Sequence, residues 1–225
     1  MRASKKSPLE RPGVFGSPTF AARDDKRAVS PSAADAGKPK KRRFPVRTEE
    51  ALKNLALSYV ARFPCTTEKL RKHLAKKMRD ALDAGEAQPG DGRKWIDGVI
   101  ETLTRVKLLD DKAYAEARAM TLHRRGRATS IIVRDLAQRG APETAILQAR
   151  DALAETSENP DLTAAARLAR KKRLGPFSKV PLTQDLRRKQ LATLARSGFS
   201  FDIARQIVDA KDPELLSDLE ARSRA

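Results

Sequence analysis

A repeated helix ending constrains this chain more than any other feature of its sequence. Residues 133–140 read Val-Arg-Asp-Leu-Ala-Gln-Arg-Gly, and residues 191–198, which lie 58 positions later, read Leu-Ala-Thr-Leu-Ala-Arg-Ser-Gly. Each segment ends on a leucine followed four residues later by a glycine, at Leu136 and Gly140 and again at Leu194 and Gly198. Glycine reaches the left-handed conformation that ends a helix. The repetition therefore predicts helical modules that stack and bury their apolar faces against one another.

The stretch 108–115 predicts where one of these modules begins. Asp110 or Asp111 can supply the side-chain oxygen that caps a new helix, and with Asp110 as the cap, Leu109 and Tyr114 fall at the positions of a hydrophobic staple. Helix capping accounts for both aspartates, although the pair could in principle hold a divalent ion. We expect the helix to run to about Arg125 and to break at the next residue, a glycine.

The same reading divides the whole chain into three modules of three helices. The modules are residues 48–107, 108–156 and 157–211, and residues 212–225 form a C-terminal tail in which a short helix could run to about Leu219. In the first module, helical spacing places Phe63, Trp95 and Val106 on inward faces. Because strand-like alternation is absent, the predicted fold class is all-α, with about nine main helices.

Residues 1–47 differ in composition from the rest. They hold six of the 13 prolines, and their 13 Lys and Arg against 4 Asp and Glu give them a net charge of +9 out of +18 for the chain. We interpret them as a disordered basic arm, because such a sequence cannot bury enough apolar surface to offset the entropy of ordering. The arm is either a solvated tail or a nonspecific contact for phosphates.

Basic residues also recur on the outward faces of the helical segments. Such stripes are either solvated faces or parts of one surface that binds DNA phosphate or an acidic protein. The candidate partner-binding and DNA-binding residues are Lys69, Lys72, Lys76, Arg79, Arg124, Arg125, Arg167, Arg170, Lys171, Arg188, Lys189 and Arg196.

The sequence offers little for catalysis or for cofactors. His73, His123 and the lone Cys65 are not spaced as metal ligands, and no glycine-rich loop precedes a Lys-Ser or Lys-Thr pair. We therefore expect no metal, no cofactor and no enzymatic activity. No run of about 20 apolar residues predicts a membrane span, and we expect a cytoplasmic monomer.

The ordered set of motifs resembles the RecX family of recombination regulators. It comprises Thr67-Glu68-x-Leu70-Arg71-x-x-Leu74, Leu-Leu-Asp-Asp-x-x-Tyr-Ala at 108–115, the basic break before Gly126, the ending at 136–140, and Leu-Ala-Arg-Ser-Gly-Phe-Ser at 194–200. The likeness covers about residues 48–211. Where relatives often carry Gly-Pro and alternating arginines, residues 127–133 read Arg-Ala-Thr-Ser-Ile-Ile-Val, which leaves the middle helix of the second module poorer in basic groups.

The resemblance implies an elongated, curved array of three-helix repeats and a regulatory role without catalysis. Such a protein would bind in the groove of RecA filaments on single-stranded DNA, inhibit ATP hydrolysis, strand exchange and coprotease activity, and so regulate recombination and the SOS response. Some members of the family also bind DNA. The alternative is a stand-alone architectural DNA-binding protein, which predicts tight binding to bare DNA with a steep dependence on salt.

Overall fold

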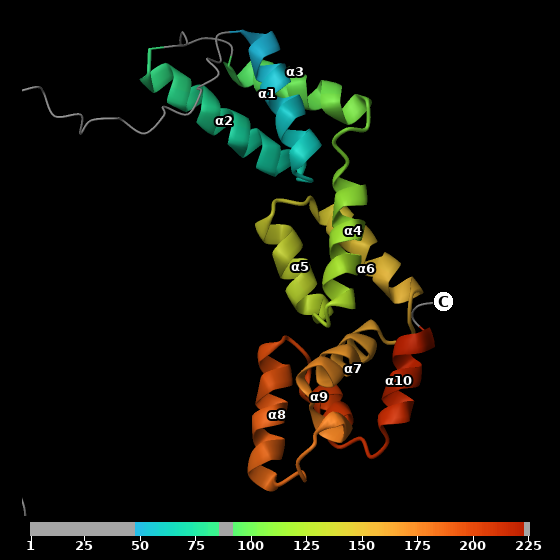
Figure 1. Ribbon diagram of the computed structural model, residues 1–225. Helices are drawn as coiled ribbons and strands as arrows, with labels where there is room; N and C mark the ends of the chain where they lie inside the picture. The colour runs from blue at the N-terminus through green and yellow to red at the C-terminus, as the bar shows by residue number, and fades with distance from the viewer. Residues whose placement is uncertain (1–47, 86–91, 223–225) are drawn as a thin grey trace, which may run out of the picture. The chain divides into compact units, whose positions relative to one another are not determined.

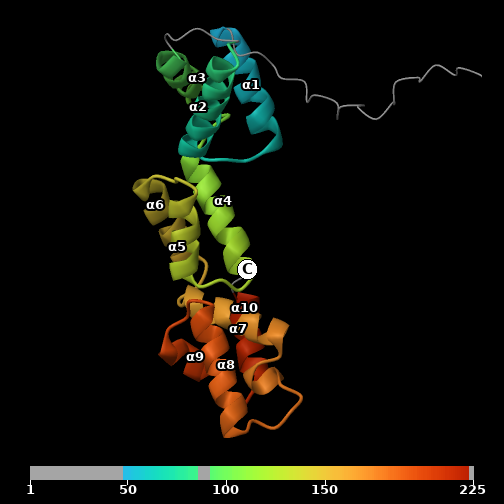
Figure 2. The same ribbon diagram turned by 90° about the vertical axis from the view of Figure 1, so that its left-hand side faces the viewer.

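The computed structural model describes residues 48–85 and 92–222, and these residues form ten α-helices and one 3-10 turn with no strand among them (Figure 1, and Figure 2 after a turn of 90°). This confirms the predicted all-α class. The expectation for the basic arm falls on residues outside the described part of the chain. Within that part, the first nine helices fall into three groups of three, which we call repeats 1, 2 and 3.

Each repeat has a first, a second and a third helix. Repeat 1 contains α1 (Glu49–Arg62), α2 (Thr67–Asp83) and α3 (Gly92–Arg105); repeat 2 contains α4 (Asp111–Arg124), α5 (Thr129–Gln138) and α6 (Glu143–Glu155); repeat 3 contains α7 (Pro160–Lys172), η1 (Gly175–Phe177), α8 (Gln184–Arg196) and α9 (Phe201–Val208), and it is followed by α10 (Pro213–Arg222).

Helix starts follow local capping chemistry. The side chains of Thr66, Asp110, Asn159, Thr183 and Ser200 each accept a hydrogen bond from a backbone N–H in the first turn of the helix that follows. These bonds satisfy donors that have no partner inside the helix. The predicted cap at Asp110 is confirmed, with 2.9 Å between its Oδ1 and the nitrogen of Ala113.

Every repeat has its own cluster of buried apolar side chains, but residues near the repeat boundaries cross over. Leu109 is 2% exposed and packs in the core of repeat 1, whereas Tyr114 packs against the core of repeat 2. The two side chains of the predicted staple thus belong to different cores. Ala128, which precedes α5 of repeat 2, is fully buried in the core of repeat 3. The repeats are therefore not separable units.

The second helices of successive repeats meet end to end. Gly140, at the C-terminal end of α5, lies against Glu68 in the first turn of α2, and the Thr66 hydroxyl donates a 2.5 Å hydrogen bond to the carbonyl of Arg139. Gly198, at the end of α8, lies against Ile131 of α5, and the Ser130 hydroxyl donates a 2.9 Å bond to the carbonyl of that glycine. We call these two contacts the α2/α5 and α5/α8 joints. They also bring the negative end of one helix dipole to the positive end of the next.

Each joint includes a carboxylate from the first helix of the later repeat. The Asp111 carboxylate accepts a 2.7 Å hydrogen bond from the backbone N–H of Thr67, the first residue of α2. Asp161 in α7 does the same for Thr129, the first residue of α5, and also accepts from its hydroxyl at 2.7 Å. Anionic groups are favoured at helix N-termini. The first helix of one repeat thus fixes the second helix of the repeat before it.

Three expectations from the sequence are corrected by the structure. Val106 and Phe63 do not point inward but are 55% and 54% exposed, because α3 ends at Arg105 and α1 ends at Arg62, before either side chain reaches the core. The terminal helix is also longer than expected: α10 reaches Arg222, and it packs against α7 with Leu216 buried in the core of repeat 3.

Candidate basic interface

Helix α2 carries the predicted basic residues on its surface. Lys72, Lys76 and Arg79 are exposed and Lys69 is half-buried. The ammonium group of Lys72 lies 3.2 Å from a carboxylate oxygen of Glu68, one turn earlier. An exposed pair of this kind contributes at most about 1 kcal/mol, so a phosphate or carboxylate of a partner can replace Glu68 at little cost.

Two of the predicted cations in repeat 3 have contacts inside the protein instead. Arg167 of α7 is half-buried, with its guanidinium nitrogen 3.2 Å from Nδ1 of His123. Arg170 donates a hydrogen bond to the Ser217 hydroxyl and lies over the ring of Phe177, at 5.5 Å from its centroid. These two arginines hold α7 to its neighbours, so they are weaker candidates for a partner than the exposed Lys171.

The other predicted cations lie at helix surfaces. Arg188, Lys189 and Arg196 are exposed on α8, and Arg124 and Arg125 are exposed at the end of α4. The α2 and α8 groups are on second helices, which the joints link through α5. The structure does not gather the candidates around one cavity.

Sequence reasoning missed one basic residue on α5. Arg134 is exposed on α5. Counted from the first residue of its helix, Thr129, it has the same position as Lys72 has when counted from Thr67, the first residue of α2. The comparison of helix endings aligned α5 with α8, where the equivalent of Arg134 is Ala192. An alignment on helix starts would have found it. Each of the three second helices therefore carries exposed basic charge.

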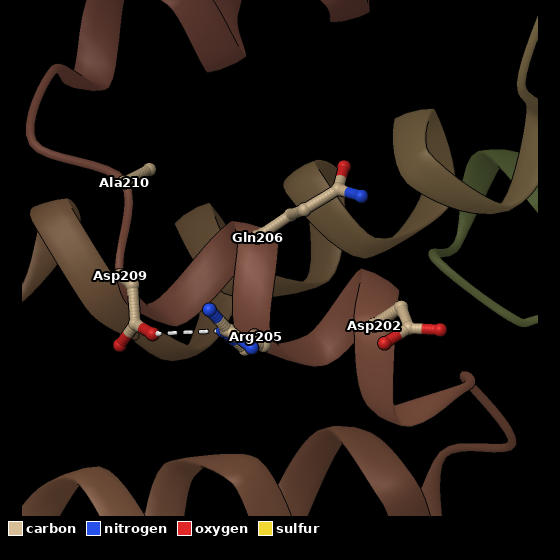
Figure 3. A pocket seen from close by; sticks show the side chains of 5 residues that line it. All are labelled: Asp202, Arg205, Gln206, Asp209 and Ala210. Carbon is tan, nitrogen blue, oxygen red and sulfur yellow. Dashed lines mark ion pairs between the residues drawn. The ribbon is translucent and has the colours of Figure 1, made fainter.

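A pocket of about 500 Å³ on α9 offers no such surface. It is lined by Asp202, Arg205, Gln206, Asp209 and Ala210, and Figure 3 shows the Arg205 side chain reaching toward Asp209, with 3.9 Å between the nearest charged atoms. Asp209 also receives two hydrogen bonds from the Arg187 guanidinium, at 2.6 and 2.7 Å. The Asp209 carboxylate of this pocket is thus already paired with two arginines.

Two buried or half-buried ionisable groups have structural roles. Asp135 of α5 accepts hydrogen bonds from Arg118 of α4 and from Arg139, and these bonds hold the pKa of its carboxyl below the ordinary value. His123, which is 1% exposed, has Nε2 at 2.7 Å from the carbonyl of Pro160, and burial above all lowers the pKa of its imidazole. The neutral ring donates from Nε2 and accepts at Nδ1, where the Arg167 guanidinium lies.

Neither a metal-binding cluster nor a membrane-spanning helix occurs among the described residues. No three His, Cys, Asp or Glu side chains in residues 48–85 and 92–222 come together as a metal site. None of the helices in those same ranges is long and apolar enough to cross a bilayer. Asp110 caps its own helix, as expected from the sequence, whereas Asp111 accepts a hydrogen bond from the first residue of α2 in repeat 1.

The fold and the surface together define a class of protein: an all-helical repeat protein whose candidate site is an exposed basic surface. No protein-family model matches the chain. Two proteins named Regulatory protein RecX are similar to it. The one from Myxococcus xanthus (strain DK1622) is 38% identical over 178 residues, which are 76% of this chain and 93% of the relative. The one from Agrobacterium fabrum (strain C58 / ATCC 33970) is 30% identical over 170 residues, which are 74% and 88%.

Solved structures agree on the fold. A crystal structure of a regulatory protein RecX matches with a TM-score of 0.53 and 23% identity over 72% of each chain. The crystal structure of RecX from Lactobacillus salivarius matches with a TM-score of 0.52 and 21% identity over 74% of this chain and 97% of that one. The chain belongs to the RecX family of regulatory proteins, which confirms the family that the sequence motifs resemble.

Proposed function

We propose that this protein regulates RecA by binding RecA nucleoprotein filaments in their groove and inhibiting ATP hydrolysis, strand exchange and coprotease activity. The proposal is supported by membership of the RecX family. The matched residues cover 93% of the length of a relative named Regulatory protein RecX. Regulation of homologous recombination and of the SOS response would follow from that activity. The protein acts without catalysis of its own and in the cytoplasm.

The basic second helices support a specific mode of contact. Lys72 and Lys76 on α2, Arg134 on α5, and Arg188 and Lys189 on α8 are exposed. We place the filament contact on these side chains, which would bind acidic surface of the recombinase, phosphates of its single-stranded DNA, or both. Exposed positive charge on each of three successive second helices suits a long polyanion better than a compact ligand.

The test is a titration of the protein into RecA filaments preformed on single-stranded DNA, with ATP hydrolysis as the readout. We expect hydrolysis to fall as the protein is added. Filaments whose ATP hydrolysis and strand exchange ignore a stoichiometric excess of protein would refute the regulatory proposal.

Charge reversal tests the assignment of the surface. We expect the double variant Lys72→Glu/Lys76→Glu to need about tenfold more protein for half-inhibition, because losing two favourable contacts at about 0.7 kcal/mol each amounts to that factor. The matched control is Lys53→Glu/Lys211→Glu, which makes the same change in net charge at exposed lysines on α1 and before α10. Equal inhibition by the two double variants would remove α2 from the contact.

The alternative function is a stand-alone architectural DNA-binding protein, which the net charge of +18 favours. It predicts tight binding to bare DNA that weakens steeply with salt, whereas the regulatory proposal predicts a preference for the filament at moderate salt. Competition between bare single-stranded DNA and RecA filaments for labelled protein separates the two.

A further inference from the structure

Three aromatic rings gather where α1 ends and α2 passes beside it. The rings of Tyr59 and His73 are stacked, with centroids 4.1 Å apart and planes 21° apart. The Phe63 ring lies 5.4 Å from the Tyr59 ring at an angle of 48°. We call these three residues the aromatic corner. Rings that pack against one another in this way hold each other in a fixed orientation.

Phe63 presents its ring to solvent for a local reason. It is the C-cap of α1 and has an extended backbone conformation, as expected of the residue before a proline. The chain therefore leaves the helix before the ring can turn onto the core that buries Leu52 and Ala56. A side chain that is 54% exposed and yet packed on Tyr59 gives the surface a flat apolar face that is already oriented.

Positive charge surrounds the corner. Lys69, Lys76 and Lys77 lie on α2 one turn before and one turn after His73, which places them on its face of the helix. Among the described residues, no ion pair involves any of these three ammonium groups. The nearby Glu68 carboxylate is paired with Arg71 and Lys72. The acidic group that follows on this face, Asp80, is half-buried.

The state of the histidine fits this picture. Burial, and then the charges of Lys77 and Lys76, lower the pKa of His73. The imidazole is therefore neutral near pH 7 and stacks on Tyr59 as an aromatic ring, and the positive charge of the corner lies on the lysines around it.

We propose that the aromatic corner is a base-stacking site for single-stranded nucleic acid, with a base on the Phe63 ring and phosphates on Lys69, Lys76 and Lys77. Proteins that bind single strands combine aromatic faces for bases with positive charge along the backbone, and a stacked base tolerates any sequence. A lysine ammonium group binds phosphate as a point charge on a flexible stem, so it can contact a strand without fixing the geometry of its backbone. The inference rests on the contact with single-stranded DNA in the proposed function, and it adds a base contact to the phosphate contacts.

The test compares two labelled oligonucleotides of equal length, oligo-dT and a strand of abasic sugar-phosphate units, bound to the full-length protein. Phe63→Ala should weaken binding to oligo-dT about tenfold, because stacking contributes on the order of 1–3 kcal/mol per base, and should change binding to the abasic strand less than about twofold. Leu215→Ala is the control, since Leu215 is an apolar side chain that is 65% exposed on α10; it should change neither affinity.

Two further variants make the result decisive. Lys76→Glu/Lys77→Glu should weaken binding to both strands and lower the slope of log affinity against log salt, because phosphate contacts release counterions. Phe63→Leu retains an apolar contact with Tyr59 and should still lose most of the preference for dT, which guards against a folding defect in the alanine variant.

Equal losses for dT and abasic strands in the Phe63 variants, or no loss, would overturn the stacking site. No binding to either strand would overturn it together with the proposed DNA contact. The RecA ATPase titration would then still decide the regulatory function separately.

Discussion

The α2/α5 joint makes a strong prediction about a single methyl group. Gly140 has φ +76°, and a Cβ added there would lie 2.8 Å from both Cβ and Cγ of Glu68. The Cβ of Glu68 is fixed to the backbone of α2, so a rotamer change cannot relieve the contact. Gly140→Ala must therefore move α5 relative to α2, or strain both.

Gly85 provides a control with almost the same backbone. It follows α2 at its other end with φ +68°, and an added Cβ there would have nothing within 4 Å. Alanine in this left-handed conformation costs about 1 kcal/mol, and both variants should lose that amount. Overpacking adds about 1–3 kcal/mol, so we expect Gly140→Ala to be destabilised by about 2–4 kcal/mol in total.

The assay is urea unfolding of both variants and the parent protein, followed by far-UV circular dichroism. A weakened joint lowers the coupling between neighbouring repeats. If the repeats of Gly140→Ala then unfold at different urea concentrations, the unfolding transition of this variant will also broaden. A difference of less than about 0.5 kcal/mol between Gly140→Ala and Gly85→Ala would refute the close contact, since only the shared backbone penalty would remain.

Two other predictions follow from the repeat boundaries. Asp161→Ala should lower the free energy of unfolding by about 1–2 kcal/mol, because it leaves the first N–H of α5 and the Thr129 hydroxyl without their acceptor; urea unfolding measures this, and Asp185→Ala on α8 is an exposed control in a first helical turn. Because burial lowers the pKa of His123, stability should be full above its ordinary value of about 6.5 and fall as pH drops below it. Unfolding midpoints at pH 7.5 and 5.5 should show a smaller difference in His123→Gln, whose amide can still donate to Pro160, and an unchanged difference would contradict the assignment.

Local chemistry made much of the fold predictable. Asp110 caps its helix as its side chain and position predict, Asn159 and Ser200 cap helices by the same chemistry, and Gly140 and Gly198 end helices in the left-handed conformation. A few neighbouring residues are enough to recognise these helix starts and helix ends. The burial of Leu136 and Leu194 follows from the same spacing.

Contacts between repeats were not predictable from the same signals. The two repeated glycines were identified as helix endings, but their lack of a side chain is also needed where Glu68 and Ile131 approach them. Asp111 was identified as a possible cap of its own helix, yet it binds the start of α2, 44 residues earlier in the chain. Nothing in a local sequence window specifies such a partner.

The candidate interface shows the same division. Helical spacing placed Lys72, Lys76 and Arg79 on one outward face, which needs only the period of a helix. The same spacing could not distinguish these three residues from Arg167. That arginine also lies on the outer flank of α7, but in the folded protein its guanidinium contacts His123 of repeat 2. The role of the basic surface as a binding site stays a prediction.

The cap of α5 bears on the order in which the protein can mature on the ribosome. Ala128 has no side-chain oxygen to offer at the N-cap position, and the carboxylate that serves there belongs to Asp161, 32 positions after Thr129. Until that later stretch has been translated, the first N–H of α5 can bond only to water, so α5 lacks part of its stabilisation. Repeat 2 therefore gains this part of its stability only after the first residues of repeat 3 have been made.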